Sequence, residues 1–174
     1  MELSGIGASE GIAIGPIHVY RPDLPEVARS QVKDPKDELG RFEEIVALVE
    51  DHLRRLGARL AETATADDAE IFEVQREFLS DPTFGGEIRR RIEKGQINAE
   101  AAVEDVMSEL VEEFKSIEDE YFLQRSHDIQ DIGTRLIRGL LGIAEDSLAN
   151  LPEPVIILAY DLTPSDTASL EAGK

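Results

Sequence analysis

The sequence predicts a helical domain inserted into an α/β domain, and so a chain that is mostly α with an α/β portion. Strand-like apolar runs lie near both ends, at residues 12–20 and 155–160. Between them, residues 34–60 and 98–142 carry apolar side chains at three- and four-residue steps, the pattern of amphipathic helices. A chain that begins and ends in strand but is helical in the middle indicates an insertion.

We expect domain boundaries near residues 32 and 143. Residues 1–32 and 144–174 would be two segments of one α/β domain, and residues 33–143 would form the helical domain. Thr163 and Pro164 predict a further helix start after the second strand. The α/β domain is incomplete in this prediction, because one strand and one helix at the C-terminal end cannot close the core of a sheet.

The composition limits the classes of partner. Asp and Glu number 37 against 18 Lys and Arg, which gives a net charge of −19. Nucleic acid is therefore not expected as a partner, since its binding depends on neutralising phosphates, whereas a basic protein would suit this charge. The alternative is that the charge only keeps the protein soluble. The sequence has neither a signal pattern nor an apolar run of about 18 residues, so no membrane association is expected. Cysteine is absent, and a reducing, cytoplasmic location is expected.

Residues 34–37 form a strong helix start, with Asp34 as the capping residue and Pro35 at the first helical position. The following apolar stripe is unbroken over roughly seven turns; its members are Leu39, Phe42, Val46, Val49, Leu53, Leu56 and Leu60. Two hypotheses follow from this stripe. It packs against other helices of the same chain, or it forms a dimeric coiled coil.

Two short helices are expected next, from Glu70 to Ser80 and from Asp81–Pro82 to Gly95. Their large apolar side chains are Phe72, Phe78, Leu79 and Phe84. These lie on both sides of a proline bend, and we expect that not all of them can point into one core. An apolar patch beside acids and arginines is typical of a protein-docking surface. The alternative is that all four belong to the core.

Residues 98–142 predict a helical hairpin. Asn98 is expected to cap the first helix, whose stripe runs from Ala99 to Ile117. Ser116 and Asp119 form an S-x-x-D pattern, so a second helix is expected to begin there. Two helices cannot bury both stripes alone, and other helices must complete the bundle.

The sequence alone offers no constellation for catalysis. His18, His52 and His127 have neither a second histidine nor a hydroxyl nucleophile at useful spacing. Acids four residues apart, such as Glu100 and Glu104, lack the Glu-x-x-His partner that would indicate a metal site. Catalytic and metal-binding residues are therefore expected to be absent.

Five motifs resemble Enzyme I of the bacterial phosphotransferase system, in the order of that family and over the whole chain. They are residues 5–15 (GIGASEGIAIG), 69–73 (AEIFE) with 79–82 (LSDP), 119–121 (DEY), 128–136 (DIQDIGTRL) and 161–165 (DLTPS). The resemblance implies the N-terminal part of a phosphoenolpyruvate–protein phosphotransferase. This enzyme transfers phosphate from phosphoenolpyruvate through its own histidine to a histidine of the carrier HPr, in sugar uptake.

The resemblance also implies what this chain lacks. The family's phosphohistidine lies in a G-G-x-T-S-H-like motif that follows the L-T-P-S helix, and this motif is not in the chain. Magnesium, phosphoenolpyruvate and the homodimer contact belong to a C-terminal domain, also not in the chain. The fragment alone is therefore expected to be inactive, with no cofactor of its own.

The resemblance further implies that the helical domain, of a four-helix type, binds HPr. The matching positions are Asp67, Asp68, Ile71, Gln75, Phe78, Leu79, Phe84, Phe114, Tyr121 and Arg125. Two alternatives stay open. One is a homologue of Enzyme I from the nitrogen-regulatory branch, and the other is a non-enzymatic acidic helical adaptor that binds a basic protein.

Overall fold

The computed structural model describes residues 10–20, 26–63 and 66–143, and from the remainder 148, 151, 153–160, 162, 166, 167 and 170; the side chains of 62–70 are not described. Contacts divide the chain into two units. One consists of residues 1–22 and 147–174, and the other of residues 23–146. The boundaries expected at residues 32 and 143 stay a prediction.

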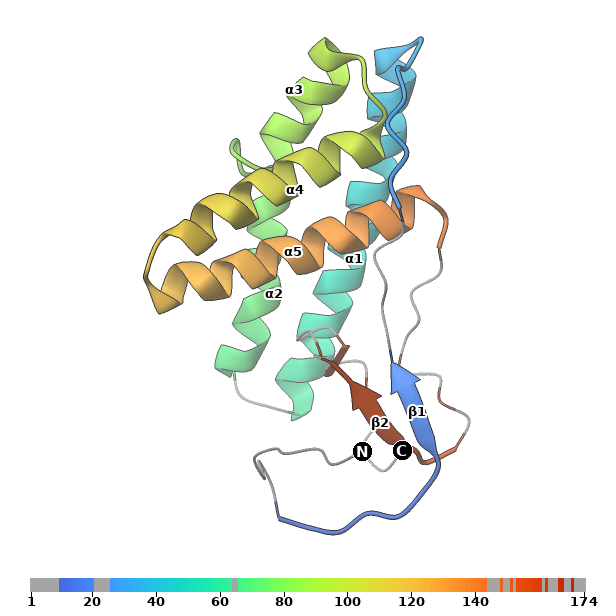
Figure 1. The fold of residues 1–174 in the computed structure, drawn as a ribbon, viewed down its shortest axis with the longest axis vertical. Helices are drawn as coiled ribbons and strands as arrows, with labels where there is room; N and C mark the ends of the chain where they lie inside the picture. The colour runs from blue at the N-terminus through green and yellow to red at the C-terminus, as the bar shows by residue number, and fades with distance from the viewer. Residues whose placement is uncertain are drawn as a thin grey trace. The chain divides into compact units, whose positions relative to one another are not determined.

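The first unit contains a small sheet. Strands β1 (Ile17–Tyr20) and β2 (Ile156–Ala159) pair in parallel, so that Ile17 lies opposite Ile156 and Tyr20 opposite Ala159 (Figure 1). The Tyr20 ring is buried, and its hydroxyl donates a hydrogen bond to Asp166 Oδ1 at 2.6 Å.

Both predicted strands are present but shorter than their apolar runs. Ile12 and Ile14 lie outside β1 and are almost fully exposed. The strand begins at Ile17, directly after Pro16, which cannot donate a ladder hydrogen bond. The helix start expected at Thr163 and Pro164 lies outside the described residues.

The second unit consists of five helices in the described part of the chain. They are α1 (Pro35–Thr63), α2 (Ala66–Ser80), α3 (Gly85–Gly95), α4 (Ala99–Ser116) and α5 (Glu120–Leu140). Helix α2 packs mainly against α1, and α5 packs mainly against α4. Figure 1 shows the α4–α5 hairpin crossing the α1–α2 pair, with the connection between α4 and α5 at its outer end. The predicted fold class, mostly helical with a small α/β portion, is confirmed.

Helix α1 begins as its sequence predicts. The Asp34 side chain accepts a hydrogen bond from the backbone N–H of Lys36 at 2.9 Å, which satisfies one of the free donors of the first turn. The middle of the stripe, from Phe42 to Leu56, is buried within the chain. These side chains are therefore not available for the coiled-coil dimer, and the intramolecular hypothesis is confirmed.

The start of α3 differs from the prediction. Asp81 and Pro82 do not begin the helix; instead, the Asp81 carboxylate accepts hydrogen bonds from the N–H and hydroxyl of Thr83, and residues 82–84 form a turn. The helix begins at Gly85, where a Cβ atom would lie 2.0 Å from the carbonyl oxygen of Leu79. Only glycine allows the turn to approach α2 so closely.

Two caps of the α4–α5 hairpin also differ from the prediction. Asn98 occupies the N-cap position of α4, but its side chain makes no capping hydrogen bond. It instead accepts from the N–H of Ser30 at 2.8 Å and donates to the carbonyl of Ala28 at 3.0 Å. The second helix begins at Glu120 and not at Ser116, because the capping side chain is that of Asp119, which accepts from the N–H of Tyr121 at 2.8 Å.

No helix in the described part of the chain has both the length and the apolar character that crossing a lipid bilayer requires.

Candidate partner-binding surface

The predicted site residues lie on three helices and one turn of the helical unit. Helix α2 carries Ile71, Gln75, Phe78 and Leu79, and the turn before α3 carries Phe84. Phe114 is on α4, and Tyr121 and Arg125 are on the first turns of α5. The side chains of Asp67 and Asp68 lie outside the described residues.

Three of these residues are not on the surface. Gln75 and Phe84 are 0% exposed and Leu79 is 1% exposed. On α2, Phe72, Gln75 and Leu79 stand at i, i+3 and i+7, which places them on one side of the helix, and this side is buried. The hypothesis that the four large apolar residues of these two helices form an exposed docking patch is therefore wrong for Phe72, Leu79 and Phe84, which belong to the core. Phe78 is half-buried and meets the Phe84 ring edge-on, with ring centroids 6.4 Å apart.

The remaining five residues keep part of their area exposed, and we call them the candidate surface: Ile71, Phe78, Phe114, Tyr121 and Arg125. Tyr121 is the most open of the three aromatic members, at 57% exposed. Helix α2 meets α5 at a hydrogen bond from Gln75 Nε2 to Asp131 Oδ2, 3.1 Å long. Tyr121 stands ten residues before Asp131, roughly 15 Å along α5, a span that fits within one ordinary protein interface.

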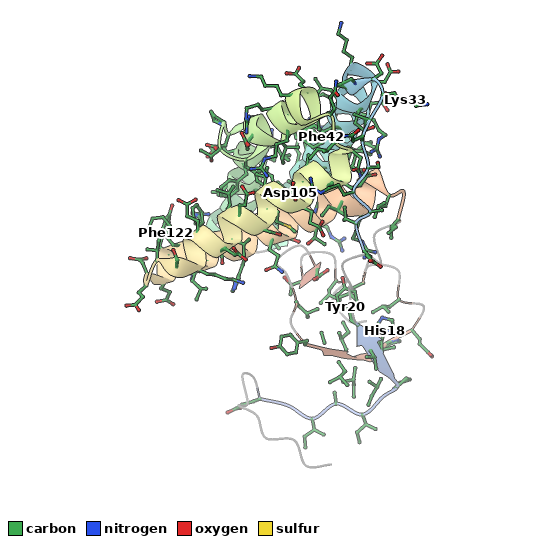
Figure 2. All side chains as sticks on the ribbon, turned by 45° about the horizontal axis from the view of Figure 1, so that its top comes forward. His18, Tyr20, Lys33, Phe42, Asp105 and Phe122 are labelled. Carbon is green, nitrogen blue, oxygen red and sulfur yellow. The ribbon has the colours of Figure 1, made fainter. Side chains whose placement is uncertain are left out.

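The corner between α4 and α5 holds a cluster of aromatic rings. The Phe122 ring meets Phe114 edge-on at 5.5 Å and Tyr121 edge-on at 5.5 Å, centroid to centroid. Figure 2 shows Phe122 near the outer end of the hairpin. Edge-on contacts between rings are favourable, so the three rings pack against one another at the corner.

Arg125 is held beside this cluster by two contacts. Its guanidinium carbon lies 4.9 Å from the centroid of the Tyr121 ring, a cation–π geometry, and its Nη1 donates to Asp128 Oδ2 at 3.0 Å. Burial raises the pKa of Asp128, and the charge of Arg125 opposes this shift. The corner therefore presents a cation in a defined place among aromatic rings.

The sequence interpretation missed two exposed apolar residues at the corner. Ile117 is 38% exposed and Leu123 is 44% exposed. Ile117 was expected to continue the buried stripe of α4, but the helix ends at Ser116. The run from Tyr121 to Leu123 contained a usable signal: three large apolar residues in succession are spread over 200° of a helix and cannot all be buried on one side.

Acidic side chains surround the corner. From residue 112 to 120 there are five acids, Glu112, Glu113, Glu118, Asp119 and Glu120, against the single base Lys115. Glu112, Glu118 and Glu120 are exposed, and within the described part of the chain none of them forms an ion pair. Their charges are therefore free to attract a basic partner.

The histidines do not converge on a site. His18 is on β1, His52 on α1 and His127 on α5, where it is exposed. Among the described residues, no group of three or more histidine, aspartate and glutamate side chains is arranged to hold a metal ion. These residues do not fit a magnesium site.

The fold and this surface define a class of protein: an acidic helical unit with an exposed aromatic corner, joined at both ends to an α/β unit. Residues 4–125 match the family model described as PEP-utilising enzyme, N-terminal. The chain belongs to the N-terminal domain family of the phosphoenolpyruvate-utilising enzymes.

Similar proteins agree with this family. The phosphoenolpyruvate-protein phosphotransferase of Bacillus subtilis (strain 168) is 37% identical over 170 residues, and that of Listeria monocytogenes serovar 1/2a is 35% identical over 170 residues. Each alignment covers 97% of this chain but 30% of the relative. The chain thus spans about a third of the length of these relatives.

Two solved structures share the fold. The NMR solution structure of an Enzyme I protein (nEIt) superposes with a TM-score of 0.79 at 29% identity, over 94% of this chain and 67% of that one. The N-terminal domain of the nitrogen Enzyme 1 gives a TM-score of 0.68 at 27% identity, over 93% and 66% of the two chains. The resemblance to Enzyme I inferred from the five motifs is confirmed.

Proposed function

We propose that the chain is the N-terminal part of a phosphoenolpyruvate–protein phosphotransferase of the sugar phosphotransferase system, and that its helical unit docks the carrier HPr. The names of the relatives support the enzyme class. The aromatic corner with its unpaired acids supports the docking role, and it is the observation on which the proposal rests. Of the two solved structures, the Enzyme I protein superposes better than the nitrogen-branch domain, so the nitrogen branch is not favoured.

The surface defines the chemistry of the partner. An apolar centre of Phe78, Phe114 and Tyr121 would bury ring area against an apolar patch, which supplies most of the affinity. The acids around the corner would face lysine and arginine side chains, and they would mainly speed the encounter. A small carrier with an apolar patch ringed by bases satisfies both conditions.

The roles of the two proteins in phosphoryl transfer follow from this arrangement. The helical unit would hold HPr so that its histidine meets the phosphohistidine of the enzyme. That phosphohistidine, the phosphoenolpyruvate site and magnesium belong, in this proposal, to parts of the enzyme outside the chain. None of His18, His52 and His127 is assigned a role in the transfer.

The test is a titration of the isotope-labelled chain with HPr from Bacillus subtilis, followed by amide chemical shifts. We expect the largest shifts in residues 71–78 and 114–125, with micromolar or tighter affinity that weakens as salt is added. Absence of binding at millimolar HPr would contradict the docking role. Binding with shifts confined to α3 would place the docking surface elsewhere.

A further inference from the structure

A row of buried and half-buried polar side chains lies where α2 meets α5, next to the candidate surface. Gln75 occupies the apolar side of α2 between Phe72 and Leu79, yet it is 0% exposed. Its Nε2 donates to Asp131 Oδ2 at 3.1 Å, and its buried Oε1 has no hydrogen-bond partner. A buried acceptor without a hydrogen-bond partner costs free energy. A leucine would fill this place and would have no such acceptor. Packing alone therefore does not require glutamine here.

The row continues along α5 in both directions. Arg125, Asp128, Asp131 and Arg135 follow one another at steps of three, three and four residues, so they lie along one side of the helix. Asp128 pairs with Arg125 at 3.0 Å, and Asp131 pairs with Arg135 at 3.9 Å. The hydrogen bond from Gln75 joins α2 to the middle of this row.

The place of this bond matters because α2 and α5 both supply the candidate surface. Phe78 lies three residues after Gln75 on α2, and Arg125 lies six residues before Asp131 on α5. Helix α2 packs mainly on α1, and α5 mainly on α4, so the contact between α2 and α5 is small. A directional bond in a small contact fixes how far one helix can slide or turn against the other, which apolar contacts do less well.

We infer that Gln75 and Asp131 are positioning residues for the docking surface: their hydrogen bond sets the register of α2 against α5, and so the spacing between Phe78 and Arg125. Neither side chain touches the partner. This inference rests on the proposed docking function. Its consequence is that loss of the bond weakens partner binding even when the helical unit stays folded.

Three variants separate this role from simple packing. Gln75→Leu removes the bond while keeping the volume filled. Asp131→Asn keeps an acceptor for Gln75 Nε2 while removing the charge. Glu73→Gln is the matched control: Glu73 stands two residues before Gln75 on the same helix, but its carboxylate is exposed and pairs with Arg76.

Calorimetric titration with HPr from Bacillus subtilis at 25 °C gives the affinity, and circular dichroism confirms folding at that temperature. We expect about fivefold weaker binding for Gln75→Leu, from the typical net strength of one hydrogen bond, and less than twofold change for Asp131→Asn and Glu73→Gln. The free Gln75→Leu protein should also shift the side-chain NMR signals of Arg125 and Tyr121, which simple destabilisation of a folded protein would not move.

The outcomes distinguish the two proposals. If the unaltered chain does not bind HPr, the docking function fails. If it binds and folded Gln75→Leu binds equally well, only the positioning role is wrong. Should Gln75→Leu be unfolded at 25 °C, Asp131→Ala tests the same bond with Gln75 in place, and unchanged affinity of that variant would overturn the inference.

Discussion

Gly133 of α5 lies directly against Met107 of α4. A Cβ atom at Gly133 would come within 2.4 Å of the Met107 sulfur and within 3.1 Å of its Cβ. The two helices of the hairpin therefore approach each other closely at a point where one of them has no side chain. Both residues are buried, so neither can move towards solvent to relieve a contact.

Gly133→Ala should destabilise the helical unit by about 1–2 kcal/mol net, measured by urea unfolding. Alanine favours a helix over glycine by about 1 kcal/mol, but the overpacked methyl group against Met107 costs more. Gly40→Ala is the matched control, because a Cβ at this position of α1 meets nothing within 4 Å. It should stabilise by about 0.5–1 kcal/mol. Equal effects of the two substitutions would show that the α4–α5 contact is looser than described.

The sequence predicted a helix correctly where its capping residues and its buried apolar stripe indicate the same helix. Asp34, Pro35 and the stripe of α1 all point to one helix, and the structure contains it. The S-x-x-D pattern at Ser116 was misleading because the Ser116 hydroxyl donates backwards to the carbonyl of Glu113 at 2.6 Å and so closes α4. Asp119 alone caps α5. A Ser or Asp side chain can cap the start of a helix or bond back to the preceding turn, and only the path of the backbone decides which of the two occurs.

The candidate surface was only partly predictable for a different reason. Periodicity shows that Phe72 and Leu79 share one side of α2, but it does not show which side meets α1. Phe84 lies in a turn, where no periodicity applies, and its burial follows from the approach of Gly85 to α2. The exposed corner at Tyr121 depends on where α4 ends, which tertiary packing determines.

Arg41 joins three helices, and its loss should be costly. Its guanidinium donates to Glu100 at 2.8 and 2.9 Å, to Glu38 at 2.6 Å and to the carbonyl of Leu140 at 3.0 Å. Arg41→Met would leave the buried carboxylate of Glu100 without its main partner. We expect a loss of about 2 kcal/mol in the free energy of unfolding, below the usual value for a buried pair because Arg41 is 37% exposed.

The control for Arg41 is Arg54→Met, which removes an exposed arginine of α1 that pairs with Asp51. It should change the stability by about 0.5 kcal/mol or less. Adding Glu100→Gln to Arg41→Met should recover part of the loss, because no buried charge then remains unpaired. Failure of this recovery would show that lost packing, and not the unpaired charge, destabilises Arg41→Met.

The stability should depend on pH through Glu87. Hydrogen bonds from Arg90 and Arg91 lower the pKa of Glu87 to about 2 from its ordinary value of 4.5. A lowered folded-state pKa means that the unfolded chain binds the proton more tightly. The contribution of Glu87 is therefore complete above about pH 4.5 and is lost as the pH falls towards 2.

Comparison of Glu87→Gln with the unaltered chain isolates this contribution. The difference in unfolding free energy should be about 1 kcal/mol at pH 7 and should vanish near pH 2.

Asp128→Asn should show the opposite trend, since burial raises the pKa of Asp128: relative to the unaltered chain, this variant should be more stable at pH 7 than at pH 3. For either variant, a difference in unfolding free energy that does not change with pH would contradict the pKa shift assigned to that residue.

The aromatic rings of the candidate surface should supply much of the affinity for HPr. Tyr121→Ala and Phe78→Ala should each weaken HPr binding by about tenfold, equivalent to ~1.4 kcal/mol, because each removes a ring of the proposed apolar centre that is at least partly exposed. Leu141→Ala is the control: Leu141 is 40% exposed and lies twenty residues beyond Tyr121, roughly 30 Å along α5. It should bind HPr like the unaltered chain.

Phe78 is half-buried, so circular dichroism must first show that its variant is folded; Tyr121, at 57% exposed, should fold normally. If folded Tyr121→Ala and Phe78→Ala both keep full affinity, HPr binds elsewhere. A loss with Leu141→Ala of the same size would move the surface to the other end of α5.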